Sequence, residues 1–146
     1  METGIPENRY QGLKALIVDD EFTFREVMGQ VLETMGIETF YAVDGIEGLE
    51  KYIEVKPDMV FTDYSMPKKN GLELAAAIQE MDPTVPIIII TASMYYELDI
   101  QSYDVNLLTI LKKPFEIEDV VYAAERAYRS ISANSQNESK SSGTRR

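Results

Sequence analysis

The chain has 146 residues, of which 45% are hydrophobic, and a formal net charge of −11. This length favours one domain with a substantial hydrophobic core, and the acidic charge disfavours direct nucleic-acid binding, which needs a basic surface. Because the chain has neither cysteine nor histidine, disulfides, Cys-His or Ser-His catalysis and zinc sites built on those residues are excluded. No apolar run could span a membrane and no signal peptide is evident, so we expect a cytoplasmic protein that makes no membrane contact.

Apolar runs that are typical of strands alternate with helical patterns along most of the chain. Because this alternation is the mark of a doubly wound α/β fold, it predicts one parallel sheet of five strands with helices on both faces. We expect strands at 14–18, 38–43, 59–62, 87–90 and 108–112. We expect helices at about 20–35, 45–55, 71–81 and 115–131, and a weaker one at 95–102.

The two ends of the chain differ in composition from the middle. Residues 1–12 are polar and contain Pro6 and Gly12, and residues 132–146 are rich in serine and lack periodicity. Such segments bury too little apolar surface to fold. The sequence therefore predicts a disordered arm at 1–12, one domain at 13–131 and a disordered tail at 132–146.

Polar residues follow four of the expected strands at the points where the strands end. Asp19 and Asp20 follow the first strand, Asp63 the third, Thr91 the fourth and Lys113 the fifth. The carboxyl ends of neighbouring parallel strands meet at one edge of a sheet, where ligands bind. Three crowded carboxylates repel one another unless a cation neutralises them, and an all-oxygen site suits Mg²⁺.

Each of these residues also has a plainer interpretation when it is taken alone. Asp63 fits a turn after a strand. Asp19 and Asp20 fit helix N-caps, although capping explains one aspartate better than two. Thr91 fits a β-branched strand position, and Lys113 a solvated lysine at a strand end. The ordered set is harder to explain in this way than any single member.

The ordered set resembles the receiver domain of two-component response regulators, the CheY-like family. The resemblance covers roughly residues 14–131, and it implies the flavodoxin-like strand order 2-1-3-4-5. It also implies that Asp63 accepts a phosphoryl group from a sensor histidine kinase or a histidine phosphotransfer protein. Such a domain catalyses only its own phosphorylation and dephosphorylation. The residues that carry the resemblance are Asp19-Asp20, Asp63 with Met66-Pro67 and Gly71, Thr91-Ala92, and Lys113-Pro114-Phe115.

The same resemblance assigns roles within the pocket. Lys113 would pair with Asp63 at rest and with the phosphoryl oxygens afterwards, and a cis bond to Pro114 would aim it inward. Thr91 would hydrogen-bond the phosphoryl group. The implied Mg²⁺ ligands are Asp19, Asp20, Asp63 and the backbone carbonyl of Ser65.

The implied output is phosphorylation-dependent binding of a downstream protein partner by a monomer or weak dimer. Thr91 would move toward the phosphoryl group and pull the loop that follows the fourth strand. Ile110 stands where the family usually has Tyr or Phe, so the usual aromatic switch is altered. Tyr95, Tyr96 and Tyr103 are candidate partner-facing residues, with ordinary core or surface positions as the alternative.

Several functions remain open at this stage. Within the family, the chain fits a stand-alone switch, a phosphorelay intermediate, or a receiver that is a fragment of a larger regulator. An enzyme of the haloacid-dehalogenase type, a phosphatase with an Asp nucleophile, is the alternative from another class. That mechanism needs a second Asp two residues after Asp63, where this chain has Ser65.

Overall fold

The computed structural model describes residues 10–92 and 100–144, with side chains described as far as residue 135, and it is built on one five-stranded sheet. The strand order is β2-β1-β3-β4-β5, and every neighbouring pair is parallel. The predicted doubly wound α/β fold with order 2-1-3-4-5 is therefore confirmed. The strands are β1 (Lys14–Val18), β2 (Glu38–Ala42), β3 (Met59–Asp63), β4 (Ile87–Thr91) and β5 (Thr109–Lys112).

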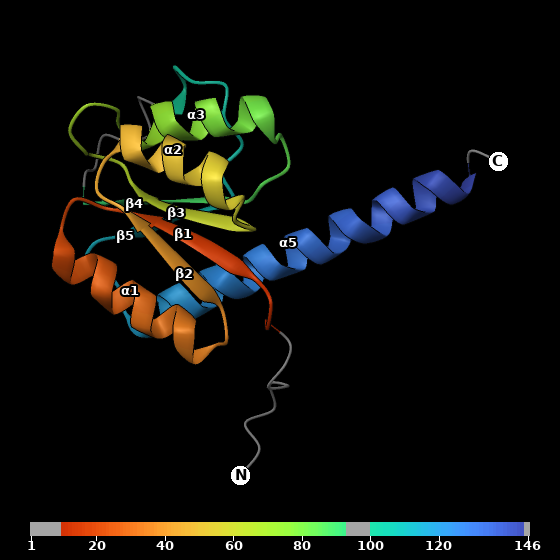
Figure 1. Cartoon of the computed structure of the whole chain (residues 1–146), viewed down its shortest axis with the longest axis horizontal. Coiled ribbons are helices and arrows are strands. Elements are labelled where there is room, and N and C mark those ends of the chain that lie inside the picture. The colour runs from red at the N-terminus through yellow and green to blue at the C-terminus, as the bar shows by residue number, and fades with distance from the viewer. Residues whose placement is uncertain (1–9, 93–99, 145–146) are drawn as a thin grey trace, which may run out of the picture.

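Helices cover both faces of the sheet. Figure 1 shows α2 and α3 on one face and α1 and α5 on the other. Most of the weak helix predicted at 95–102 lies outside the described residues. The described helices are α1 (Phe22–Thr34), α2 (Gly45–Val55), α3 (Gly71–Met81) and α5 (Ile117–Thr144).

The core is divided by the sheet into two apolar layers. Ile17 and Phe61 face α1 and α5, whereas their neighbours Leu16 and Val60 face α2 and α3. Every residue of β3 and β4 is buried. This double burial explains why the central strands have continuous apolar runs instead of an alternating pattern.

The start of α1 rules out helix capping by Asp19 and Asp20. The N-cap residue is Glu21, and its side chain makes no capping hydrogen bond. The Oδ1 atom of Asp19 accepts a hydrogen bond of 2.9 Å from the backbone N–H of Glu21, which closes a turn before the helix begins. Both aspartates therefore lie in the loop that leaves the sheet, at the edge where a site was predicted.

The buried face of α2 is formed by Gly45, Gly48 and Tyr52 and not by its isoleucines. Ile46 and Ile53 are 45% and 53% exposed. The helix approaches the sheet through Gly48, where an added Cβ would lie 3.0 Å from Leu74 and 3.2 Å from Val18. This close approach turns the isoleucines outward, because a glycine face brings the helix backbone nearer to the sheet than a face of large side chains does.

The final helix is longer than predicted. The sequence indicated an end near Ile131 and a disordered tail beyond it, but α5 continues to Thr144 and extends past the body of the domain (Figure 1). Residues 132–142 contain no Pro or Gly that would end the helix. A helix that is already nucleated gains one hydrogen bond for each added residue.

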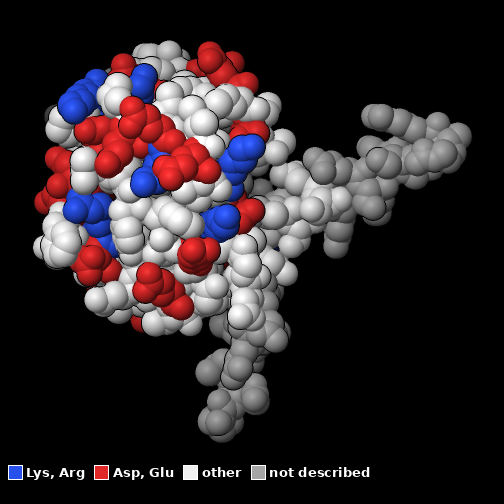
Figure 2. Space-filling model, viewed as in Figure 1, with Lys and Arg blue, Asp and Glu red and all other residues white. Residues whose placement is uncertain are grey.

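The surface of the domain reflects its composition. Figure 2 shows acidic side chains predominating on the face in view, with basic ones scattered among them, and the whole chain has a net charge of −11. Within the described ranges, no helix combines the length and apolarity that crossing a membrane demands.

Candidate functional site

The polar residues that follow four strands meet at one cavity, at the carboxyl edge of the sheet. The cavity has a volume of about 590 Å³. It is lined by Asp20, Glu21, Asp63, Ser65, Thr91, Ala92 and Lys113. The geometry thus brings the predicted phosphoacceptor, hydroxyl and lysine into one space, together with a residue that the sequence analysis did not select, Glu21.

Three carboxylates gather beside this cavity. Asp19, Asp20 and Asp63 each offer one oxygen, and the three oxygens lie within 4.8 Å of one another. Asp19 and Asp63 are buried, whereas Asp20 is exposed. The buried Oδ2 of Asp19 lies 3.2 Å from the ammonium of Lys113, but it accepts no well-aligned hydrogen bond from the described residues. This acidic triad fits a receiver-type metal site, because hard carboxylate oxygens are the ligands that Mg²⁺ prefers.

Lys113 lies at the centre of the carboxylates. Its Nζ is 2.9 Å from Oε1 of Glu21, 3.2 Å from Oδ2 of Asp19 and 3.5 Å from Oδ2 of Asp63. The ammonium also lies 4.0 Å from the centre of the Phe24 ring, in cation–π contact. Its side chain is 9% exposed, so the solvated interpretation of Lys113 is wrong. At rest the lysine is shared among three carboxylates, of which Glu21 is the nearest.

Burial and crowding shift the ionisation of this cluster. Burial, followed by the charge of Asp19, raises the pKa of Asp63 from 3.8 to about 7, although Lys113 opposes the rise. Burial also raises the pKa of Asp19, against the opposing effects of its backbone hydrogen bond and Lys113. Burial alone would lower the pKa of Lys113, but Glu21, Asp63 and Asp19 together raise it. The cluster therefore favours an added cation.

Backbone hydrogen bonds and the close approach of α3 hold the carboxyl ends of β3, β4 and β5 in place. A Cβ added to Gly71 would overlap the carbonyl oxygen of Asp63, so only glycine allows α3 to begin this close to the strand. The N–H of Tyr64 donates to the carbonyl of Ile90 at 2.8 Å, and the N–H of Lys113 donates to the carbonyl of Thr91 at 2.8 Å. The Lys113–Pro114 bond is cis, as the resemblance implied.

Of the predicted switch and partner residues, Thr91 lines the cavity, whereas Ile110 and Tyr103 are not among its lining residues. Ile110 is partly buried on β5 and lines a separate cavity of about 320 Å³ beside Tyr122. Tyr103 is partly buried in the connection between β4 and β5. Tyr95 and Tyr96 lie outside the described residues, so their predicted role keeps its status as a prediction.

Glu21 is the site residue that sequence reasoning missed. It is separated from Lys113 by 92 positions, so no local sequence pattern predicts the contact between the two side chains. The available signal was its place directly after Asp19-Asp20, which makes it a third consecutive acidic residue.

Comparison with known proteins extends the match to most of the chain. The model of the response regulator receiver domain family matches residues 15–125. The chain is 33% identical over 115 residues to sporulation initiation phosphotransferase F of Bacillus subtilis, which covers 77% of this chain and 91% of that protein. It is 34% identical over 116 residues to the chemotaxis protein CheY of Listeria monocytogenes, with 79% and 98% covered.

Solved structures show the same fold. A response regulator receiver domain protein from Clostridium thermocellum superposes with a TM-score of 0.72 at 29% identity, covering 80% of this chain and 94% of that one. The residues matched by the family model, 15–125, include parts of all five strands and every described residue that lines the acidic cavity.

Proposed function

Because the chain belongs to the response regulator receiver domain family, whose members are phospho-accepting proteins, we propose that Asp63 is its phosphoacceptor. One observation carries this assignment: among the three clustered carboxylates, Asp63 is the one that lies at a strand end, lines the cavity and also contacts Lys113. Asp19 contributes to the cluster from outside the cavity lining. Membership of the family implies a histidine kinase or a histidine phosphotransfer protein as the donor.

The proposed reaction is phosphoryl transfer to a carboxylate. An oxygen of Asp63 attacks the phosphorus of a phosphohistidine, the P–N bond breaks, and the bonding electrons leave with the imidazole, which takes a proton from solvent. The product is an acyl phosphate. Because charge spreads over the phosphoryl oxygens, positioning and countercharge provide most of the catalysis. Lys113 supplies one positive charge at 3.5 Å from Asp63, and the hydroxyl of Thr91 supplies a hydrogen bond.

Asp19, Asp20, Asp63 and the backbone carbonyl of Ser65 would hold Mg²⁺. When bound, the ion supplies countercharge to the carboxylates and to the phosphoryl oxygens. The ion would also favour the ionised form of Asp63, which the reaction needs because only the carboxylate is nucleophilic. Without a cation, the pKa of Asp63 is about 7, so a substantial fraction of the carboxyl is protonated near neutral pH. The reactivity of Asp63 therefore depends on the cation that the acidic triad binds.

The proposed output is phosphorylation-dependent binding of a protein partner. Thr91 ends β4 and leads into the segment before β5, so a shift of its hydroxyl reaches that segment first. We expect beryllofluoride with Mg²⁺, a phosphoryl mimic, to move the amide resonances of residues 92–110 more than those of residues 24–53. Equal shifts in both segments would contradict this route, and shifts limited to the cavity would make the protein a phosphate carrier.

A phosphorelay intermediate is the second candidate within the family. The observation that favours it is the 33% identity to a protein named as a phosphotransferase. A receiver that is part of a larger regulator is also consistent with α5, which continues to Thr144. The phosphatase alternative lacks its general acid, because Ser65 stands two residues after Asp63.

The decisive experiment is phosphorylation by a small-molecule donor. The purified chain is incubated with Mg²⁺ and acetyl phosphate, and intact mass and peptide mapping follow. We expect one phosphoryl group on Asp63 that persists for minutes, and none on Asp63→Asn, with Asp104→Asn as the matched control. A phosphoryl group on another residue would overturn the assignment, and multiple turnover of p-nitrophenyl phosphate would indicate the phosphatase.

A further inference from the structure

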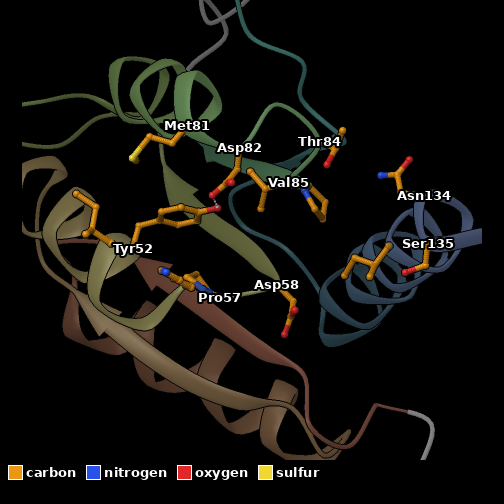
Figure 3. Close-up of a pocket in the computed structure, with 13 residues that line it drawn as sticks. Tyr52, Pro57, Asp58, Met81, Asp82, Thr84, Val85, Asn134 and Ser135 are labelled. Carbon is orange, nitrogen blue, oxygen red and sulfur yellow. Dashed lines mark hydrogen bonds between the residues drawn. The ribbon is translucent and has the colours of Figure 1, made fainter. Parts of the chain in front are cut away.

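A second cavity lies at the opposite edge of the sheet from Asp63. It has a volume of about 550 Å³ and opens beside the amino ends of β3 and β4. Its walls come from the ends of α2 and α3, the segment before β4, and α5. Figure 3 shows Tyr52, Met81 and Asp82 on one side of this groove and Asn134 and Ser135 of α5 across from them. The proposed phosphorylation chemistry uses none of these residues.

The lining of the groove combines polar side chains with apolar ones, and the apolar ones lie both within it and at its rim. Pro57 and Pro86 are buried beneath it. At the rim, Ile53 is 53% exposed and Met81 is 46% exposed. Two large aliphatic side chains, one from each of two neighbouring helices, leave a patch of exposed hydrophobic surface that continues into a cavity. Such a combination is characteristic of a binding surface.

One carboxylate is fixed at the edge of this apolar surface. The hydroxyl of Tyr52 donates to Oδ2 of Asp82 at 2.6 Å, a bond drawn in Figure 3. The tyrosine is only 4% exposed, and burial followed by the bond to Asp82 raises its pKa, so it stays a donor at physiological pH. Asp82 is therefore held in one orientation by a buried partner.

The charge of Asp82 is not neutralised within the described part of the chain, where no lysine or arginine lies within 4.0 Å of it. It caps the carboxyl end of α3, whose last turn has no basic residue, and that helix end adds its own partial negative charge. Asp58 adds a second carboxylate, which accepts a bond from the backbone of Lys14. Among the described residues that line the groove, Lys56 is the only base.

The continuation of α5 completes the groove. Ile131, Asn134 and Ser135 line it, and their spacing of three and four places them on one face of the helix. A helix that ended at Ile131, as predicted, would leave the groove open on this side. This wall combines the apolar side chain of Ile131 with the amide of Asn134 and the hydroxyl of Ser135. The amide and the hydroxyl can form hydrogen bonds with a peptide backbone.

We propose that this groove binds a segment of a partner protein in which an aliphatic or aromatic side chain is next to a lysine or arginine. The apolar side chain would pack between Ile53 and Met81, and the cation would pair with Asp82. Charge complementarity selects this occupant, because the fixed carboxylate and the end of α3 both favour a positive group. The groove and the phosphorylation cavity lie at opposite edges of the sheet, so the partner binds whether or not Asp63 is phosphorylated.

A peptide titration of the full ¹⁵N-labelled chain tests the proposal. The probe is an amphipathic peptide of lysine and leucine, and its counterpart replaces each lysine with glutamate. We expect the lysine peptide to shift the amides of Tyr52, Asp82 and Val85, and the glutamate peptide to leave them unchanged. Adding beryllofluoride and Mg²⁺ should change the affinity of the chain for the lysine peptide by no more than about twofold. Peptide binding can therefore be tested independently of whether Asp63 accepts a phosphoryl group.

Matched variants separate the groove from general attraction to an acidic protein (Figure 2). Asp82→Asn keeps an acceptor for Tyr52 and should weaken binding about tenfold, since it removes a charged hydrogen-bond partner. Glu80→Gln removes one charge from the same helix outside the groove and should have little effect. Ile53→Ser should weaken binding roughly tenfold, whereas Ile46→Ser, a comparably exposed isoleucine of α2 outside the groove, should not.

Three results would overturn the proposal. Equal losses in Asp82→Asn and Glu80→Gln would show that only net charge attracts the peptide. Peptide-induced shifts centred on Asp63 would place its site at the other edge of the sheet. Shifts of the groove amides on raising protein concentration without peptide would mean that a second copy of the chain occupies the groove.

Discussion

Replacing Asp63 with asparagine should stabilise the metal-free protein, by an amount that depends on pH. Asparagine resembles the protonated carboxyl in size and, like it, carries no charge. In the folded protein, burial and Asp19 raise the pKa of Asp63 from 3.8 to about 7. A carboxyl with a raised pKa destabilises the fold once the unfolded chain ionises, so the cost is absent below about pH 4, grows as pH rises, and levels off above about pH 7.

The size of the effect follows from the same two values. At ~1.4 kcal/mol per pKa unit, the raised pKa of Asp63 lowers the free energy of unfolding by roughly 2 kcal/mol near pH 5.5, where folding must protonate the carboxyl, and by roughly 4 kcal/mol near pH 8, where the carboxylate is buried in its ionised form. The advantage of the asparagine variant should therefore grow by about 2 kcal/mol between these two conditions. Lys113 keeps Glu21 and Asp19 as partners in the variant, so no buried ammonium is left alone.

Urea unfolding of both proteins in EDTA at the two pH values measures this difference. Asp104→Asn, a change at an exposed position, serves as the control and should show no pH-dependent gain. Saturating Mg²⁺ should stabilise the wild type more than Asp63→Asn, since a ligand stabilises the state that binds it. An asparagine variant that is less stable at pH 8, or equally favoured at both pH values, would refute the account of a strained, charge-crowded cluster.

Three further changes test other parts of the site. Asp20→Ala should abolish Mg²⁺ binding in isothermal titration. Its free energy of unfolding, from a thermal melt, should change by less than about 0.5 kcal/mol, because Asp20 is exposed and caps no helix. If the variant still binds Mg²⁺, Asp20 is not a ligand of the metal. Glu21→Gln should speed phosphorylation by acetyl phosphate by about two- to fivefold, the value of one partly exposed ion pair, by releasing Lys113 toward Asp63; a slower rate would instead mean that Glu21 assists the reaction. Gly71→Ala should lower the free energy of unfolding in urea by about 1–3 kcal/mol, because the added Cβ overlaps the Asp63 carbonyl. An unchanged urea midpoint would show that the loop shifts to make room for the Cβ.

The fold and the centre of the site could be predicted because their signals are local. Buried central strands require continuous apolar runs, and the polar residue that ends each run marks the carboxyl edge of the sheet. Asp63 and Thr91 end β3 and β4, and Lys113 directly follows β5. Their meeting in one cavity then follows from parallel strand order, which the resemblance to a known family supplied.

Only the tertiary structure established the contacts between distant segments. Glu21 is the nearest partner of Lys113, although 92 positions separate them, and neither residue has a local pattern that selects the other. The outward turn of Ile53 depends on how closely Gly48 lets α2 approach Leu74 and Val18. The groove beside Asp82 exists because α2 and α3 end at the edge of the sheet that α5 passes. Periodicity in a sequence reports which residues of one element share a face, but the packing of other elements sets how that face is covered and what is left exposed.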